Sequence, residues 1–92
     1  PERKEAIQEL LNAGVFHKVQ YSNAGADVWV NPGFYLLTFE NKEAACSIVW
    51  AYAAAANRSK LVDVHLRDSR SGNKVGNYGN HLLSGFGLKM KD

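Results

Sequence analysis

The stretch from Ala44 to Ala56 constrains the fold more than any other part of the chain, because Ser47 alone interrupts its run of apolar residues. A membrane-spanning helix needs about 20 apolar residues, so this shorter stretch predicts a buried helix of a water-soluble protein without a membrane partner. We expect the helix to begin at a cap residue, Thr38 or Asn41, and to end at Asn57. The side expected to face the core carries apolar residues at helical spacing: Ala45, Ile48, Val49, Tyr52, Ala55 and Ala56.

The other side of this helix is also apolar, whereas a surface helix carries lysine and glutamate there. Exposed apolar patches mark interfaces, and tryptophan is frequent among the residues that dominate binding energy. The sequence therefore predicts a small interaction domain that associates with itself, as a homodimer or a higher oligomer, or with another protein. The residues expected to form this interface are Trp50, Cys46, Ala53, Ala54 and Trp29. The alternative is that the N-terminal helix covers this side within the monomer.

Apolar residues that alternate with polar ones predict short strands in the rest of the chain. A helix is expected over residues 1–13, strands over residues 15–21, 26–31 and 34–39, the long helix next, and strands over residues 60–68, 74–78 and 86–90. This order, α-β-β-β-α-β-β-β, predicts one α+β domain over residues 1–92, with about five or six short, mainly antiparallel strands and two helices. The alternative is a small curled barrel of the OB type with the long helix over one opening.

The same alternation predicts which side of each strand faces the core. The apolar side of the first strand is expected to carry Val15, His17, Val19 and Tyr21. Phe16 and Lys18 are expected on its opposite side. In the strand over residues 60–68, the core side is expected to carry Val62, Val64 and Leu66, and the solvent side Asp63, His65 and Arg67. A polar turn over residues 68–73 is expected to join this strand to the next.

Charge is divided unevenly along the chain. Residues 1–57 carry four basic and six acidic side chains, and residues 58–92 carry seven basic and three acidic ones. A second hypothesis is therefore a small nucleic-acid-binding module, in which the C-terminal hairpin supplies phosphate contacts and an aromatic stacking platform. The residues expected to make these contacts are Arg67, Arg70, Lys74, Lys89 and Tyr78. A third hypothesis is a binder of a small apolar ligand between the sheet and the helix.

The motifs of the common catalytic and cofactor sites do not occur in this sequence. The glycines between residues 72 and 87 fit neither phosphate-binding pattern, G-x-x-x-x-G-K-S/T or G-x-G-x-x-G. Asp63 and His65 share a strand side with Arg67, whose charge opposes a metal cation. Cys46 lies in an alanine-rich helix without a base beside it. The sequence therefore predicts a non-enzymatic protein with no catalytic residue, no cofactor and no metal site.

Cys46 is the single cysteine of the chain, so no intramolecular disulfide is expected. No targeting segment is recognised within residues 1–92. Pro1 fits removal of an initiator methionine better than cleavage by signal peptidase, which favours small residues at the cut. These features favour the cytoplasm, and a processed secreted protein is the alternative.

Several short motifs follow one another between Val28 and Met90, a span of about two thirds of the chain. They are Leu37-Thr38 before the long helix, Lys42 and Trp50-Ala51-Tyr52 within it, the turn from Asp68 to Lys74, Tyr78, and the terminal Gly85-Phe86-Gly87-Leu88-Lys89. In this order they resemble a loose group of small uncharacterised bacterial proteins. That group has no assigned activity, so the resemblance implies a fold and a bacterial origin but no mechanism.

Overall fold

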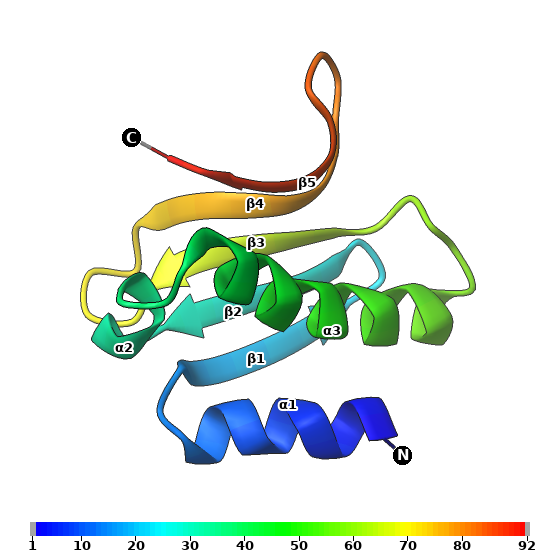
Figure 1. Ribbon diagram of the computed structural model, residues 1–92. Helices are drawn as coiled ribbons and strands as arrows, with labels where there is room; N and C mark the ends of the chain where they lie inside the picture. The colour runs from blue at the N-terminus through cyan, green and yellow to red at the C-terminus, as the bar shows by residue number, and fades with distance from the viewer. Residues whose placement is uncertain (1, 92) are drawn as a thin grey trace.

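The computed structural model describes residues 2–91, which form three helices and one five-stranded sheet (Figure 1). In chain order the elements are α1 (Glu2–Asn12), β1 (Phe16–Ser22), β2 (Gly25–Val30), α2 (Pro32–Tyr35), α3 (Phe39–Asn57), β3 (Asp63–Asp68), β4 (Lys74–His81) and β5 (Gly85–Met90). The predicted α+β class is confirmed, whereas the part of the first helix expected at Pro1 lies outside the described residues.

The five strands lie in the sheet in their order along the chain. The neighbours β1–β2, β3–β4 and β4–β5 are antiparallel, while β2 and β3 are parallel because α3 carries the chain back along the sheet. β1 and β5 form opposite edges, so the sheet is open and the barrel alternative is wrong. The prediction of a mainly antiparallel sheet is confirmed, with one parallel pair that hairpin signals do not indicate.

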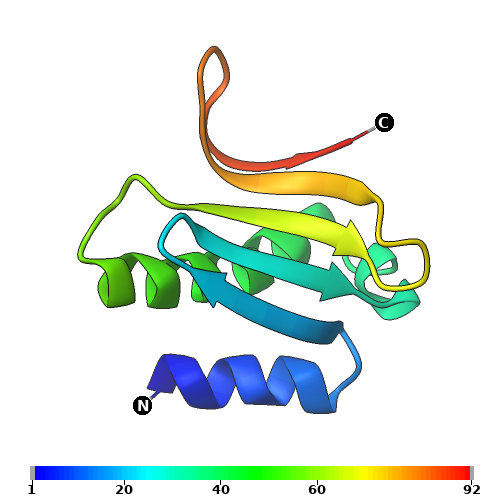
Figure 2. The ribbon, with the colours of Figure 1, turned by 180° about the vertical axis from the view of Figure 1, so that it is seen from behind.

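The sheet has one covered face and one open face. α3 lies across the first face, and α1 lies alongside β1 (Figure 1). In the view from behind, the strands lie in front of α3, and no helix of residues 2–91 crosses the second face (Figure 2). We call this second face the outer face.

The hydrophobic core fills the space between α3 and the sheet. Its largest fully buried side chains are Phe16, Phe34, Leu66, Val28, Val30, Val49, Val64 and Cys46. Burial of such an aliphatic or aromatic side chain contributes about 1.5–3 kcal/mol. The apolar side of α3 that meets the sheet is therefore part of the core of this chain.

The prediction of a strand over residues 34–39 is wrong. Pro32 is the first residue of the short helix α2, a position where its fixed φ and missing N–H are well tolerated. Thr38 then caps α3, because its Oγ1 accepts the Asn41 N–H at 3.1 Å. The segment is apolar because Phe34 is fully buried, and a short apolar run alone does not distinguish a strand from a buried helical turn.

A β-bulge near the start of β1 corrects the predicted sides of that strand. Phe16 pairs with Val30 and Lys18 pairs with Trp29, so His17 is an extra residue on β1. The extra residue shifts the alternation by one position. Phe16 therefore faces the core with only 1 % of its surface exposed, instead of facing solvent together with Lys18.

Candidate functional site

Two residues of the predicted interface are buried within the chain. α3 directs Cys46 and Ala53 at the sheet, and both are 0 % exposed. Trp50 is half-buried: its Nε1–H donates to the Val62 carbonyl oxygen at 2.8 Å, and its ring packs edge-on against Phe86 with 4.9 Å between centroids. The prediction that these side chains are available to a partner is therefore wrong for Cys46 and Ala53, and Trp50 is held mainly by contacts within the chain.

The remaining two residues of that prediction lie in different places, one on the sheet and one on α3. Trp29 lies on the outer face of the sheet, where Lys18 Nζ is 4.1 Å from its ring centroid. Ala54 lies on α3 and is partly exposed, next to the exposed Ala55. The five predicted residues do not share one surface. A helix that is apolar all round has no polar side to indicate its orientation, so the pattern alone misplaced them.

Cys46 is a structural thiol. Burial raises its pKa to about 12, and the negative charge of Glu43 acts in the same direction. At neutral pH the sulfur therefore stays protonated, and a thiol is a poor nucleophile in that form.

The outer face carries polar residues that pair across neighbouring strands. Along each strand these residues alternate with residues that point into the core. Asp27 pairs with His65, His65 with Asn77, and Asn77 with Lys89, so one row crosses the sheet from β2 to β5. The predicted exposure of His65 on its strand is confirmed by the burial of the residues on either side of it.

A second row on the outer face brings cations together. Trp29 pairs with both Lys18 and Arg67, and Arg67 pairs with Lys74. Lys91 continues the pairing of β5, because its N–H donates to the Val75 carbonyl oxygen at 2.7 Å. The face as a whole carries the cationic residues Lys18, Arg67, Lys74, Lys89 and Lys91, and the acidic residues Asp27 and Asp63.

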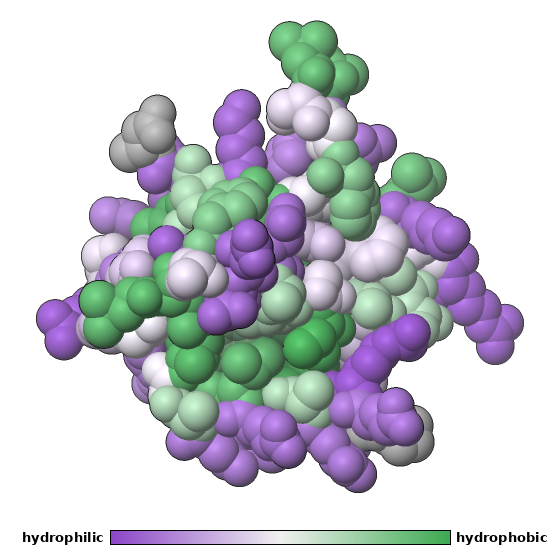
Figure 3. Space-filling view, viewed as in Figure 1, coloured by the Kyte–Doolittle hydropathy of each residue, from purple (hydrophilic) through white to green (hydrophobic). Residues whose placement is uncertain are grey.

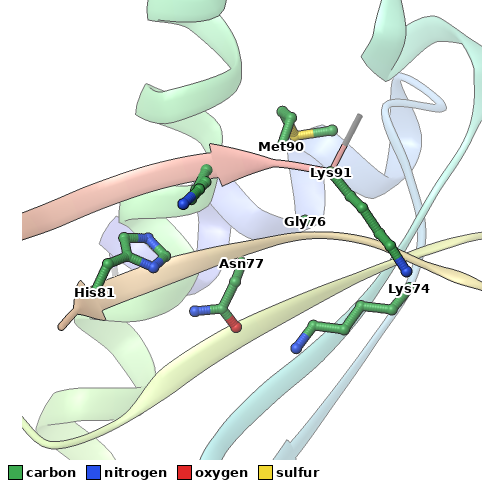
Figure 4. Close-up of a pocket in the computed structure, with 7 residues that line it drawn as sticks. Lys74, Gly76, Asn77, His81, Met90 and Lys91 are labelled. Atoms are coloured by element: carbon green, nitrogen blue, oxygen red, sulfur yellow. The ribbon is translucent and has the colours of Figure 1, made fainter. Parts of the chain in front are cut away.

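A hollow of about 330 Å³ opens beside β4 and β5 (Figure 4). We call it the basic hollow, and its lining residues are Lys74, Gly76, Asn77, His81, Lys89, Met90 and Lys91. Among the lining residues that the structure describes, three are lysines and none is acidic. In Figure 4, Lys74 and Lys91 extend over one end of the hollow, and His81 lies at the other. The arrangement is suited to an anionic ligand.

Two polar groups in the basic hollow bear on what it could hold. His81 is oriented by its Nε2, which donates to the Gly87 carbonyl oxygen at 2.9 Å. The side-chain Oδ1 of Asn77 is buried without a hydrogen-bond partner among the described residues. Buried polar atoms are normally bonded, so this oxygen is suited to accept a donor from a ligand or from water.

Arg67 is held in place on the outer face by weak contacts. Its Nε is 4.0 Å from Asp27 Oδ1, with the two side chains 38 % and 37 % exposed, and its Nη1 donates to the Gly72 carbonyl oxygen at 3.3 Å. Exposed ion pairs of this kind contribute about 0–1 kcal/mol. The guanidinium can therefore exchange Asp27 for another anion at little energetic cost.

The turn between β3 and β4 forms as predicted and presents Arg70 to solvent. Asp68 Oδ1 accepts the N–H groups of Arg70 and Ser71 at 2.8 and 3.0 Å. Its Oδ2 accepts the Tyr35 hydroxyl at 2.8 Å. Burial and the Asp68 carboxylate raise the pKa of Tyr35 to about 12, so this hydroxyl stays a donor at neutral pH.

We expect Asp68 to titrate below the usual carboxyl pKa of 3.8. The N–H of Ser71, the hydroxyl of Tyr35 and the N–H of Arg70 all stabilise the carboxylate, in that order. Because the pKa is lower in the folded chain, the stabilisation is present above the unfolded pKa and is lost as pH falls through the folded value. An NMR titration of the carboxyl carbons measures this, and Tyr35→Phe should raise the pKa of Asp68. An Asp68 pKa at or above 3.8 would contradict the bonds described.

The structure divides the predicted nucleic-acid contacts into two groups. Arg67, Lys74 and Lys89 lie together on the outer face. Arg70 lies in the turn between β3 and β4, beside Arg67 and Lys74. Tyr78 instead faces α3 and is 7 % exposed, so its predicted stacking role is wrong.

A register shift in β4 explains the error at Tyr78. Strict alternation from Lys74 predicts that Tyr78 points to the same side as Lys74. Arg67 pairs with Lys74 while Leu66 pairs with Gly76, so Val75 is an extra residue and the later positions of β4 are inverted. The inversion also brings Asn77 and His81 to the outer face, where sequence reasoning did not expect functional residues.

The end of the β4–β5 hairpin projects from the body of the protein (Figure 1). Its turn carries Leu82 and Leu83, which are 98 % and 97 % exposed. In the space-filling view from the same side, the end of this hairpin forms an apolar protrusion at the top (Figure 3). These leucines lie beyond the basic hollow and do not line it.

Over residues 2–91, no helix combines the length and the apolar character needed to cross a membrane. A search of the same residues finds no group of three or more His, Cys, Asp or Glu side chains placed to hold a metal ion. Comparison of the chain with protein-family models, with curated proteins and with solved structures finds no significant match.

Proposed function

We propose that the protein is a small nucleic-acid-binding module that holds single-stranded DNA or RNA on the outer face of its sheet. The observation that carries the proposal is the basic hollow, in which three lysines and a histidine gather and no acidic side chain of residues 2–91 is among the lining residues. Phosphate groups are the anions that repeat along a nucleic-acid strand, and lysine or arginine contacts to them release counterions and favour binding.

The spacing of the cations suits a linear polyanion. Lys89 and Lys91 are two residues apart on one strand, which separates them by about 6.7 Å. Lys74 lies on the neighbouring strand and pairs with Arg67 on the next one. A backbone crossing the strands can therefore contact one cation after another, rather than a single isolated charge.

Trp29 supplies a stacking surface on the same face. A base stacked on an aromatic side chain contributes about 1–3 kcal/mol, largely independent of sequence. Lys18 lies over the ring at 4.1 Å and is itself exposed, so it can move aside or remain as a phosphate contact. This role replaces the one that the sequence assigned to Tyr78.

The other two hypotheses from the sequence have less support. Self-association through α3 has less support because Cys46 and Ala53, two of its expected contact residues, are buried in the core. A small apolar ligand would need space between α3 and the sheet, where Val28, Val49 and Val64 are each 0 % exposed and fill the interior.

We expect binding of a labelled single-stranded oligonucleotide to depend steeply on salt. Four phosphate contacts, from Arg67, Lys74, Lys89 and Lys91, predict a log–log slope of about −2.8. Affinity should then fall about fifty-fold between about 50 and 200 mM salt. Fluorescence titration measures both quantities. No binding at about 100 μM protein in the low-salt buffer would contradict the proposal.

Matched variants locate the binding face. Lys89→Ala should reduce the magnitude of the salt slope by about 0.7, whereas Lys4→Ala on α1 should leave it unchanged. Trp29→Ala should weaken binding about 5- to 150-fold, from the loss of one stacking contact. Equal effects of Lys89→Ala and Lys4→Ala would mean that binding is unspecific and does not use the outer face.

A further inference from the structure

β5 is an open edge of the sheet. Within residues 2–91 it pairs with β4 alone, while α1 lies alongside β1 at the opposite edge (Figures 1 and 2). The N–H and C=O groups of such an edge are a template for another strand. The Glu43 side chain of α3 reaches this edge, where its Oε2 accepts the Leu88 N–H at 3.1 Å.

The hydrogen bonds show which residues of β5 present their backbone groups outward. In an antiparallel pair, alternate residues direct their N–H and C=O toward the neighbouring strand. The N–H of Lys91 donates to the Val75 carbonyl oxygen, so the odd-numbered residues face β4. The N–H of Leu88 is bonded to the α3 carboxylate and therefore points away from β4. Phe86 and Met90 share its direction.

The sequence of β5 is complementary to itself when two copies run antiparallel about Leu88. The pairs are then Leu88 with Leu88, Phe86 with Met90, Gly87 with Lys89, and Gly85 with Lys91. Each lysine is opposite a glycine. The glycine leaves room for the lysine side chain, and no lysine lies directly opposite another lysine. The apolar pairs fall on the α3 side of the sheet, where Phe86 is 53 % exposed and packs on Trp50 and Tyr78.

We propose that a second copy of this chain adds to the sheet at β5 and forms a two-fold symmetric dimer with its axis at Leu88. The outward N–H and C=O groups of Phe86, Leu88 and Met90 form the new ladder. A register centred on Lys89 would set two lysines directly opposite each other, which is unfavourable. The charge pattern therefore favours the register centred on Leu88 over the one centred on Lys89.

Glu43 competes with this pairing. Its carboxylate occupies the central N–H of the edge, and it must move before a second strand binds. The Glu43 carboxylate can approach the edge because residue 87 is glycine: a Cβ at that position would lie 2.8 Å from Glu43 Oε2. We therefore expect Glu43→Ala to strengthen dimerisation by at least about 100-fold, because a charge-assisted hydrogen bond then no longer has to be broken in each of the two copies.

The dimer does not depend on the proposed nucleic-acid binding, because backbone groups and the α3 side of β5 carry it, and of the residues in its ladder Met90 alone also lines the basic hollow. The test therefore uses the protein alone, by sedimentation equilibrium from about 10 μM to 1 mM. We expect the mass to rise from 10.2 kDa toward twice that value as concentration increases. A mass that stays at 10.2 kDa throughout would overturn the proposal.

Substitutions at Met90 test the edge itself. Met90→Pro removes an outward N–H and leaves the β4–β5 ladder intact, since proline is tolerated on an edge strand in this orientation. It should abolish dimerisation, whereas Met90→Ala keeps the N–H and should remain dimeric. A Met90→Pro variant that is folded by circular dichroism and still dimeric would overturn the proposal.

Two further measurements keep the test decisive if Met90→Pro does not fold. Amide hydrogen exchange of Phe86 and Met90 in the unmodified protein should slow as its concentration rises, and unchanged exchange alongside a rising mass would overturn the proposal. A Leu82→Ser, Leu83→Ser double variant removes the exposed apolar residues of the hairpin turn. It should still dimerise, and its loss of dimerisation would assign the contact to the turn instead of the edge.

Discussion

Replacing Phe34 with alanine is expected to lower the free energy of unfolding by about 3–5 kcal/mol, the range for large aromatic residues removed from a core. Phe34 belongs to a helix of four residues, yet it is 0 % exposed, and its ring centroid is 6.2 Å from that of Phe16. Truncation removes the ring and leaves a cavity that the surrounding strands fill only in part. Denaturant unfolding followed by tryptophan fluorescence measures the change.

Leu36 is a matched control for this experiment. It follows α2 directly and is 87 % exposed, so Leu36→Ala should alter stability by no more than about 0.5 kcal/mol. Comparing the two variants shows whether the loss of stability comes from the burial of Phe34 or from any substitution in this segment. A loss below about 1 kcal/mol for Phe34→Ala would mean that α2 is not docked on the core.

Replacing Gly25 with alanine is expected to destabilise the protein by about 2–6 kcal/mol, the sum of backbone strain and steric overlap. Gly25 has a φ of +136°, which side chains with a Cβ rarely adopt. An added Cβ would collide with the Asp63 carbonyl oxygen and lie 2.8 Å from the Asp63 N atom. Gly25 and Asp63 begin the parallel pairing of β2 with β3, so the collision acts at the junction of the two halves of the sheet.

Gly72 allows the two contributions to be separated. It also has a positive φ, +76°, but an added Cβ meets nothing within 4 Å. Gly72→Ala should therefore show the backbone strain alone, about 1–2 kcal/mol. Thermal unfolding of both variants gives the comparison, and equal losses would show that the approach of Asp63 to Gly25 contributes little.

The parts of the fold that could be predicted are those with a strong local signal. The sequence predicts a long apolar helix that begins at a cap, Thr38 or Asn41, and ends at Asn57; α3 is capped by Thr38 and ends at Asn57. The alternation around Val64 correctly separates core from solvent, because β3 has no bulge before Arg67. The polar residues after Asp68 form the predicted turn for the same local reason, since a carboxylate accepts the N–H groups that follow it.

The errors come from interactions between segments that are distant along the chain. The extra residues His17 and Val75 invert the sides of β1 and β4, and a bulge is defined by the partner strand rather than by its own residues. The orientation of α3 depends on the sheet that it covers. In the candidate site, charge alone indicates Arg67, Lys74 and Lys89, whereas the predicted side of Tyr78 is wrong because of the bulge in β4.

The single parallel pair of the sheet has a consequence for how the chain folds. The strands of the β1–β2 and β3–β4–β5 pairings are neighbours along the chain, and hairpins of this kind close in about 1–10 μs. β2 and β3 meet only after residues 31–62 have turned back along the sheet. Such a non-local contact loses chain entropy before it contributes any stabilisation, which slows folding. We therefore expect two rapidly formed hairpin units and a later, rate-limiting step in which α3 docks and joins them.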